Sequence, residues 1–221
     1  MIKANLNGIK IAAITCAVPK AIDDLSKYRE SFGDKAIEEF SNMTGVKERH
    51  IAKEEQTSSD LVFVAAKNLI NREQIDVSEI GACIFVTQTP DYRIPATACV
   101  LHKRLGLPVD CIAFDVNLGC SGYVYGLNIA ASIMKTNEID KCLFLVGDTS
   151  NKDISDEDKS ACMLFGDAAA ATLLIKDSTS IMSGVYRTDG NDFKAIITPS
   201  GAYRNRNAKK ERTNVLIMSS I

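Results

Sequence analysis

The segment with the clearest chemical potential surrounds Cys120. Residues 114–127 (FDVNLGCSGYVYGL) run from an apolar strand pattern through small residues into a helical pattern. Cys120 would then lie on the turn at the start of the helix, where unsatisfied backbone N–H groups and the helix macrodipole favour a thiolate over a thiol. A thiolate is a suitable nucleophile for moving acyl groups between thioesters, and Gly119 and Gly122 would leave room for a substrate. The same pattern also fits an unreactive, half-buried cysteine.

The other cysteines have a simpler interpretation. The total of seven is odd and no pair is spaced as C-x-x-C, which argues against a disulfide framework and a zinc site. Most stand in apolar runs such as residues 82–86 (ACIFV), where a free cysteine behaves as a small buried hydrophobe. We expect this inert, buried state for Cys16, Cys83, Cys99, Cys111, Cys142 and Cys162. We expect no metal and no cofactor.

Two candidate binding residues follow the apolar run at residues 82–87. Thr87 ends this run, and Ile94 lies a few residues further on. Open α/β sheets form ligand sites outside the carboxyl ends of their strands. We therefore predict that residues 87–89 (TQT) and Ile94 are functional, and that Thr87 and Ile94 help to bind a substrate.

Other polar residues are predicted to be structural. Asp167 stands among small residues at 165–170 (FGDAAA) and can accept backbone hydrogen bonds in a turn. Asp148 follows an apolar run as a turn residue, and nothing in the sequence gives His50 a catalytic partner.

These residues need a scaffold, and the hydrophobic pattern predicts one. Apolar runs of strand length alternate with helical periodicity, which indicates an α/β layered fold whose central sheet is mixed and mostly parallel, with helices on its faces. Strands are expected at residues 9–15, 82–87, 112–116, 142–146, 168–175 and 181–187. Helices are expected at residues 35–43, 58–71, 95–104 and 121–136. Ser58 or Ser59 would cap the second helix, and Pro95 would open the third.

The chain is predicted to contain two regions. Residues 1–200 would form the cysteine-bearing domain. Residues 201–221 would be an exposed basic loop followed, at residues 214–218, by the start of another element. We therefore expect a continuation that this sequence does not contain.

Composition excludes several classes of function. The chain is 46% hydrophobic and 24% charged, as in globular proteins, and its formal net charge of −2 argues against nucleic-acid binding. No apolar run approaches the roughly 20 residues of a membrane helix, and the first residues lack the apolar region of a secretory signal. We therefore expect a cytoplasmic protein without a membrane or nucleic-acid partner.

The segment around Cys120 resembles the nucleophile segment of the beta-ketoacyl-acyl-carrier-protein synthase III family. The resemblance extends to residues 44–51 (TGVKERHI), 94–98 (IPATA) and 165–170, in the family's order, and covers nearly the whole chain from residue 9. It implies one repeat of the thiolase-like fold at residues 1–200 and the start of a truncated second repeat at residues 201–221.

The resemblance also implies an activity. Cys120 would take an acyl group from a thioester, and a malonyl group on acyl carrier protein would then be decarboxylated and attack it. The partners would be acyl carrier protein, an acyl thioester bound to coenzyme A or to the carrier, and a second subunit joined through the edge strand at residues 112–116. The loop with Thr87 and Ile94 would line the acyl pocket and meet that subunit.

The sequence departs from the family pattern in two respects. The family uses a histidine and an asparagine from the second half of its fold, so we expect the isolated chain to be inactive in condensation. Relatives primed by coenzyme A carry a tryptophan and an arginine where Glu39 and Met43 stand, while Lys159 falls where they often have another arginine. We therefore predict that Lys159 binds the substrate. The pattern also favours an acyl donor carried by a protein, or a specialised pathway.

Three alternatives remain open at this stage. One is another condensing enzyme, such as a hydroxymethylglutaryl-coenzyme-A synthase, although Thr87-Gln88-Thr89 lacks the glutamate base of that enzyme. The second is a non-catalytic acyl-binding or interaction subunit. The third is an α/β hydrolase, which the segment around Cys120 fits poorly.

Overall fold

The computed structural model describes residues 2–159, 161–199, 201–205 and 216–217. The chain forms two compact units. The first contains residues 1–18, 55–148 and 168–187, and the second contains residues 19–54, 149–167 and 188–221.

The first unit is built on a five-stranded sheet in the order β2-β8-β7-β5-β6. Its strands are β2 (Ile9–Ala17), β5 (Ile80–Val86), β6 (Ile112–Val116), β7 (Lys141–Asp148) and β8 (Ala168–Lys176). Strands β6, β5 and β7 are parallel, whereas β8 is antiparallel to both β7 and β2. Four of the five strands therefore point in one direction and only β8 is reversed, as the predicted mixed, mostly parallel sheet requires.

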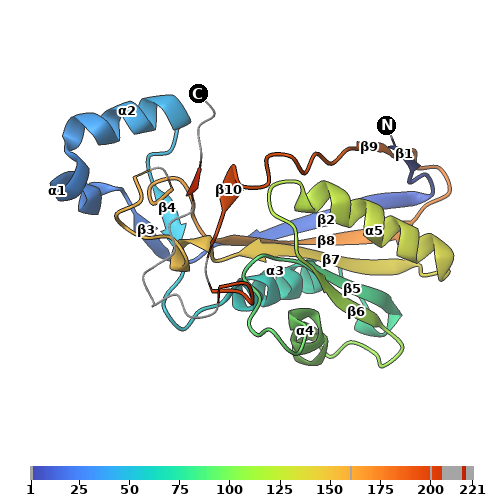
Figure 1. Cartoon of the computed structure of the whole chain (residues 1–221). Coiled ribbons are helices and arrows are strands. Elements are labelled where there is room, and N and C mark those ends of the chain that lie inside the picture. The colour runs from blue at the N-terminus through green and yellow to red at the C-terminus, as the bar shows by residue number, and fades with distance from the viewer. Residues whose placement is uncertain (1, 160, 200, 206–215, 218–221) are drawn as a thin grey trace. The chain divides into compact units, whose positions relative to one another are not determined.

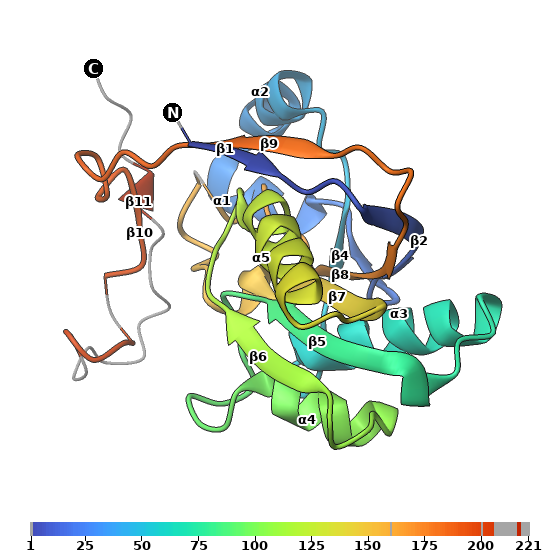
Figure 2. The ribbon, with the colours of Figure 1, turned by 90° about the vertical axis from the view of Figure 1, so that its right-hand side faces the viewer.

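Helices cover both faces of this sheet (Figure 1). The helices are α3 (Ser58–Arg72), α4 (Thr97–Leu105) and α5 (Gly122–Thr136). Side chains alternate along β5, so that Cys83 and Phe85 pack beneath α3 and α4, while Ile84 packs against α5. Figure 2 shows α5 lying across one face of the sheet, next to the antiparallel pair of β1 (Ile2–Asn5) and β9 (Ser183–Tyr186).

One predicted helix cap and one predicted helix start were wrong. The N-cap of α3 is Thr57, whose N–H donates to the Asp60 carboxylate at 3.0 Å in a capping box, so neither Ser58 nor Ser59 caps the helix. Both serines face inward and bind the loop after β5 instead. Helix α4 begins at Thr97 rather than at Pro95.

The second unit has a small core of its own. It contains the antiparallel pair of β3 (Ala21–Asp23) and β4 (Arg49–Ile51). Its other elements are the helices α1 (Arg29–Phe32) and α2 (Asp34–Thr44) and the short strands β10 (Ile196–Ile197) and β11 (Leu216–Ile217). Tyr28 and Phe40 are buried with Cys162 and Met163. The predicted basic loop and the element at residues 214–218 lie outside the described residues, apart from residues 201–205 and 216–217.

Candidate active site

Cys120 lies on the turn between β6 and α5, as the pattern predicted. The Gly122 N–H closes this turn by donating to the Gly119 carbonyl at 2.7 Å, and the Tyr125 N–H donates to the Ser121 carbonyl at 3.0 Å. Cys120 itself is exposed. Its thiol is therefore presented to solvent at the amino-terminal end of a 15-residue helix.

Two glycines let α5 approach the sheet closely. A Cβ on Gly122 would lie 2.7 Å from Val86 Cγ1, and a Cβ on Gly126 would lie 2.5 Å from two ring carbons of Phe144. Such distances are shorter than real side chains tolerate, so any larger residue would push the helix away from the strands. The small residues thus determine where the helix start, and with it Cys120, lies.

Thr87 follows the strand next to the one that leads to Cys120. Strands β5 and β6 are parallel with Val86 opposite Val116, and the Thr87 N–H donates to the Val116 carbonyl at 3.1 Å. The two carboxyl ends are therefore side by side, and the turn with Cys120 emerges next to Thr87. The Thr87 side chain is only 2% exposed.

The carboxylate of Asp148, at the end of β7, organises the loop after β5. Its Oδ1 accepts hydrogen bonds from the Thr87 hydroxyl at 2.9 Å, from the Gln88 N–H at 2.7 Å, and from the N–H and hydroxyl of Thr89, both at 3.1 Å. Asp148 is thus more than the turn residue predicted for it. The Gln88 carboxamide lies against Gly119, because a Cβ there would be 2.6 Å from Gln88 Oε1.

The far end of this loop is anchored on β6. The two carboxylate oxygens of Asp115 accept the N–H groups of Thr97 and Ala98 at 2.6 and 2.7 Å, which caps the first turn of α4. Ile94, in the same loop, is 85% exposed. Its apolar side chain is therefore available for a substrate or a second subunit.

Comparisons with known proteins agree with this geometry. The sequence profile of the family "3-Oxoacyl-[acyl-carrier-protein (ACP)] synthase III" matches residues 114–190, which contain Cys120. The chain is 35% identical over 205 residues to a putative 3-oxoacyl-[acyl-carrier-protein] synthase 3 of Campylobacter jejuni, covering 91% of this chain and 58% of that protein. Over about nine tenths of its length, the chain is therefore similar to proteins of the synthase III family.

Two further proteins show the same similarity. A beta-ketoacyl-[acyl-carrier-protein] synthase III of Xanthomonas campestris is 35% identical over 196 residues, with 87% of this chain and 59% of that protein covered. The crystal structure of a 3-oxoacyl-(acyl-carrier protein) synthase from Burkholderia xenovorans is similar with a TM-score of 0.87 at 34% identity, covering 93% of this chain and 59% of that one. The fold is thus the thiolase-like fold. The chain spans a little under three fifths of each relative.

Lys159 and the two histidines make local contacts of their own. Lys159 belongs to the second unit, where its side chain is exposed and its N–H donates to the Glu157 carbonyl at 3.1 Å. His102 Nε2 lies 2.8 Å from the Pro108 carbonyl oxygen, at the amino end of β6 and one strand length (~16 Å) from its carboxyl end. His50 Nδ1 lies 2.7 Å from the Pro19 carbonyl oxygen. His102 is therefore not placed as a partner of Cys120, and His50 belongs to the second unit.

The motif with Asp167 is structural, as predicted. Asp167 accepts the Ala52 N–H at 2.8 Å and the Asn151 N–H at 3.1 Å. Burial raises the pKa of this carboxyl, and the two backbone donors oppose that shift. Arg49, also buried, binds Asp23 at 2.5 Å and the Phe165 carbonyl at 2.7 Å, so this part of the family motif holds the second unit together.

The prediction for the six other cysteines was partly wrong. Cys83, Cys111, Cys142 and Cys162 are buried, but Cys16 and Cys99 are exposed. Cys16 lies on an edge strand and Cys99 on a surface helix, where one side of each element faces solvent. Burial raises the pKa of the Cys111 thiol to about 11 and that of Cys83 well above its usual value.

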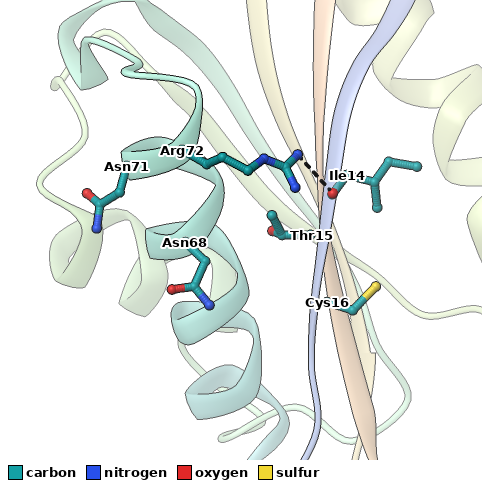
Figure 3. A pocket seen from close by; sticks show the side chains of 6 residues that line it. All are labelled: Ile14, Thr15, Cys16, Asn68, Asn71 and Arg72. Atoms are coloured by element: carbon teal, nitrogen blue, oxygen red, sulfur yellow. Dashed lines mark hydrogen bonds between the residues drawn. The ribbon is translucent and has the colours of Figure 1, made fainter.

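A separate pocket lies at the other edge of the sheet (Figure 3). It has a volume of about 680 Å³ between α3 and β2 and is lined by Ile14, Thr15, Cys16, Asn68, Asn71 and Arg72. Arg72 donates to the Ile14 carbonyl at 3.1 Å and Thr15 to the Ala65 carbonyl at 2.6 Å. These groups already serve the packing of α3 on β2, so we do not assign this pocket to the reaction.

The described residues contain no cluster of three or more metal-binding side chains. Nor is any described helix long and apolar enough to cross a membrane. The sequence singled out residues 87–89, which include Gln88, but sequence reasoning missed the anchoring role of Asp148. The available signal was that Asp148 is a polar residue just beyond a predicted strand, where a loop site would be built.

Proposed function

We propose that this chain forms the acyl-carrying part of a 3-oxoacyl-acyl-carrier-protein synthase III, with Cys120 as the acylated residue. The observation that carries the proposal is the exposed thiol at the start of α5, within the segment that the family profile matches. In this proposal residues 1–200 are the amino-terminal repeat and residues 201–221 begin the second.

The acyl transfer would proceed by thioester exchange. Cys120 Sγ attacks the carbonyl carbon of the donor, a new C–S bond forms, and the bond to the donor sulfur breaks, so that the donor leaves as a thiolate that takes up a proton. The negative charge on the carbonyl oxygen needs hydrogen-bond donors during the attack. The Cys120 N–H suits this role, because it donates to no other described residue.

Condensation would follow in the whole enzyme. A malonyl group on acyl carrier protein loses carbon dioxide, and the resulting carbanion attacks the acyl thioester, which lengthens the chain by two carbons and frees Cys120. Relatives use a histidine and an asparagine for this step, and both histidines here bind backbone carbonyls. We therefore expect the isolated chain to transfer acyl groups without condensing them. Turnover comparable to that of a full-length relative would refute this expectation.

The donor is proposed to be carried by a protein rather than by coenzyme A. The positions that contact the nucleotide in coenzyme-A-primed relatives carry Glu39, which is ion-paired with Lys35 at 3.8 Å, and Met43, which is 80% exposed. A carboxylate repels a polyphosphate, although the exposed Lys159 keeps one positive charge where relatives often have an arginine for the nucleotide. Release of thiol from acyl carrier protein thioesters and from acetyl-coenzyme A should be compared, with Cys120→Ala as the blank. Faster reaction with acetyl-coenzyme A would contradict the proposed donor, and thiol release unchanged in Cys120→Ala would contradict the role of Cys120.

A homodimer is proposed to form along β6. This strand is at one end of the sheet, and its outer backbone groups face away from the other strands. Exposed Tyr92 and Ile94 lie in the loop between β5 and α4. Light scattering after size exclusion should give a mass above that of one chain, and Ile94→Glu should lower it. A monomer with the wild-type sequence would contradict the proposal.

A further inference from the structure

The Gln88 carboxamide lies directly beside the backbone that carries the nucleophile. A Cβ on Gly119 would be 2.6 Å from Gln88 Oε1 and 3.4 Å from Nε2, so the amide occupies the space that a side chain at position 119 would fill. Gly119 is the residue before Cys120. A hydrogen-bond donor and an acceptor are therefore placed next to the turn that presents the thiol.

The backbone of Gln88 is fixed, whereas its side chain is uncommitted. Its N–H donates to Asp148 Oδ1 at 2.7 Å, and the same oxygen holds Thr87 and Thr89 on either side. The carboxamide makes no hydrogen bond to another described residue, and Gln88 is exposed. The backbone of Gln88 is held in place, and its carboxamide can hydrogen-bond to a ligand. Polar groups placed in this way orient ligands in binding sites.

An acyl group on Cys120 would change the surroundings of this amide. Because Gln88 is exposed, a plain aliphatic chain would displace only the water on the side of the carboxamide that it covers, which is unfavourable where a hydrogen bond is lost. A hydroxyl on the acyl chain would both accept from the Nε2–H and donate to Oε1, so it would replace the lost water. Sites that hydrogen-bond a substrate hydroxyl discriminate strongly against analogues that lack it.

We propose that Gln88 is a specificity-determining residue that favours acyl groups bearing a hydroxyl near the thioester carbonyl over unsubstituted acyl groups of the same length. This inference rests on the proposed function, because it requires that Cys120 carries the acyl group. It names the acyl class that the site selects.

The test compares two acyl carrier protein thioesters, 3-hydroxybutyryl and butyryl, which differ by one hydroxyl. Acylation of Cys120 is followed by intact mass at equal concentrations. The wild-type protein should react about tenfold faster with the hydroxylated thioester. Gln88→Leu keeps the size of the side chain but removes both hydrogen-bonding groups, so it should bring the ratio of the two rates close to one. Gln88→Ala should do the same.

Asn71→Leu is the matched control, because it makes the same carboxamide-to-leucine change in the pocket at the opposite edge of the sheet (Figure 3). It should keep the wild-type ratio. A wild-type ratio near one, or a ratio that persists in both Gln88 variants, would overturn this inference alone. If neither thioester acylates Cys120 while iodoacetamide still alkylates it, the proposed function fails, and this inference fails with it.

Discussion

The Asp148 carboxylate at the end of β7 accepts a 2.9 Å hydrogen bond from the Thr87 hydroxyl at the end of β5. The same oxygen holds the backbone of the next two residues, so one carboxylate connects two neighbouring strands at the edge where Cys120 emerges. The loop beside the thiol is therefore positioned by a carboxylate from another strand.

Replacing Asp148 should weaken both stability and acyl transfer. Asp148→Ala removes the acceptor of four hydrogen bonds and should lower the free energy of unfolding by about 1–3 kcal/mol. Asp148→Asn keeps a carbonyl oxygen at this place and should retain most of the stability. Urea unfolding and the rate of Cys120 acylation should be measured together. An alanine variant as stable and as fast as the wild type would show that the carboxylate does not position the loop.

Gly126 should not tolerate even a methyl group. A Cβ there would lie 2.5 Å from the Phe144 ring, and overpacking of this kind costs about 1–3 kcal/mol, whereas alanine gains only about 1 kcal/mol in helix propensity. Gly126→Ala should therefore unfold at lower urea concentration than the wild type. Gly190→Ala is a suitable control, because nothing lies within 4 Å of its Cβ. Equal urea midpoints of unfolding for the two variants would indicate that α5 can shift to accommodate the added methyl group.

Asp167 should give stability a specific pH dependence. Its folded-state pKa is raised by burial above the usual 3.8, so the folded protein binds the proton more tightly than the unfolded chain. The stability contribution of this group is therefore present below pH 3.8 and is lost as the pH rises through the raised value. Asp167→Asn lacks this titration. The wild type should thus gain stability relative to Asp167→Asn as the pH falls through this window, and a constant difference in unfolding free energy would contradict the assignment.

Alkylation should separate the cysteines by burial. At pH 8 iodoacetamide should modify the exposed Cys16, Cys99 and Cys120 in the folded protein, and all seven in guanidinium chloride. Cys111 should become reactive only as the pH approaches its pKa of about 11, because it remains a thiol below that value. Peptide mapping measures each site. Rapid labelling of Cys83 at pH 8 would mean that the core opens readily.

Local patterns predicted the elements well, and long-range contacts explain where they failed. The strand at residues 112–116 was confirmed with its predicted bounds, because its apolar run is bordered by polar and small residues. The start of α4 was misplaced because its cap comes from Asp115 on another element. The strand Ile2–Asn5 was missed because it is short and because its partner, residues 183–186, lies about 180 residues later in the sequence.

The candidate site was predictable only where it depends on local sequence patterns. Cys120 and Thr87 follow directly from strand ends, so their positions could be predicted from the sequence. The contact of Gln88 with Gly119 depends on the register of β5 with β6, which pairs Val86 with Val116, and no local pattern encodes that register. The anchoring role of Asp148 depends likewise on β7 lying beside β5.

The most direct test of the central claim is to identify the residue that becomes acylated. The protein should be exposed briefly to an acyl carrier protein thioester, digested, and analysed by tandem mass spectrometry for the added acyl mass. We predict that the acyl group is on Cys120, and that Cys120→Ala carries none although its Cys16 and Cys99 remain exposed. An acyl group found on Cys16 or Cys99 at an equal rate, or no acyl group on Cys120, would contradict this claim.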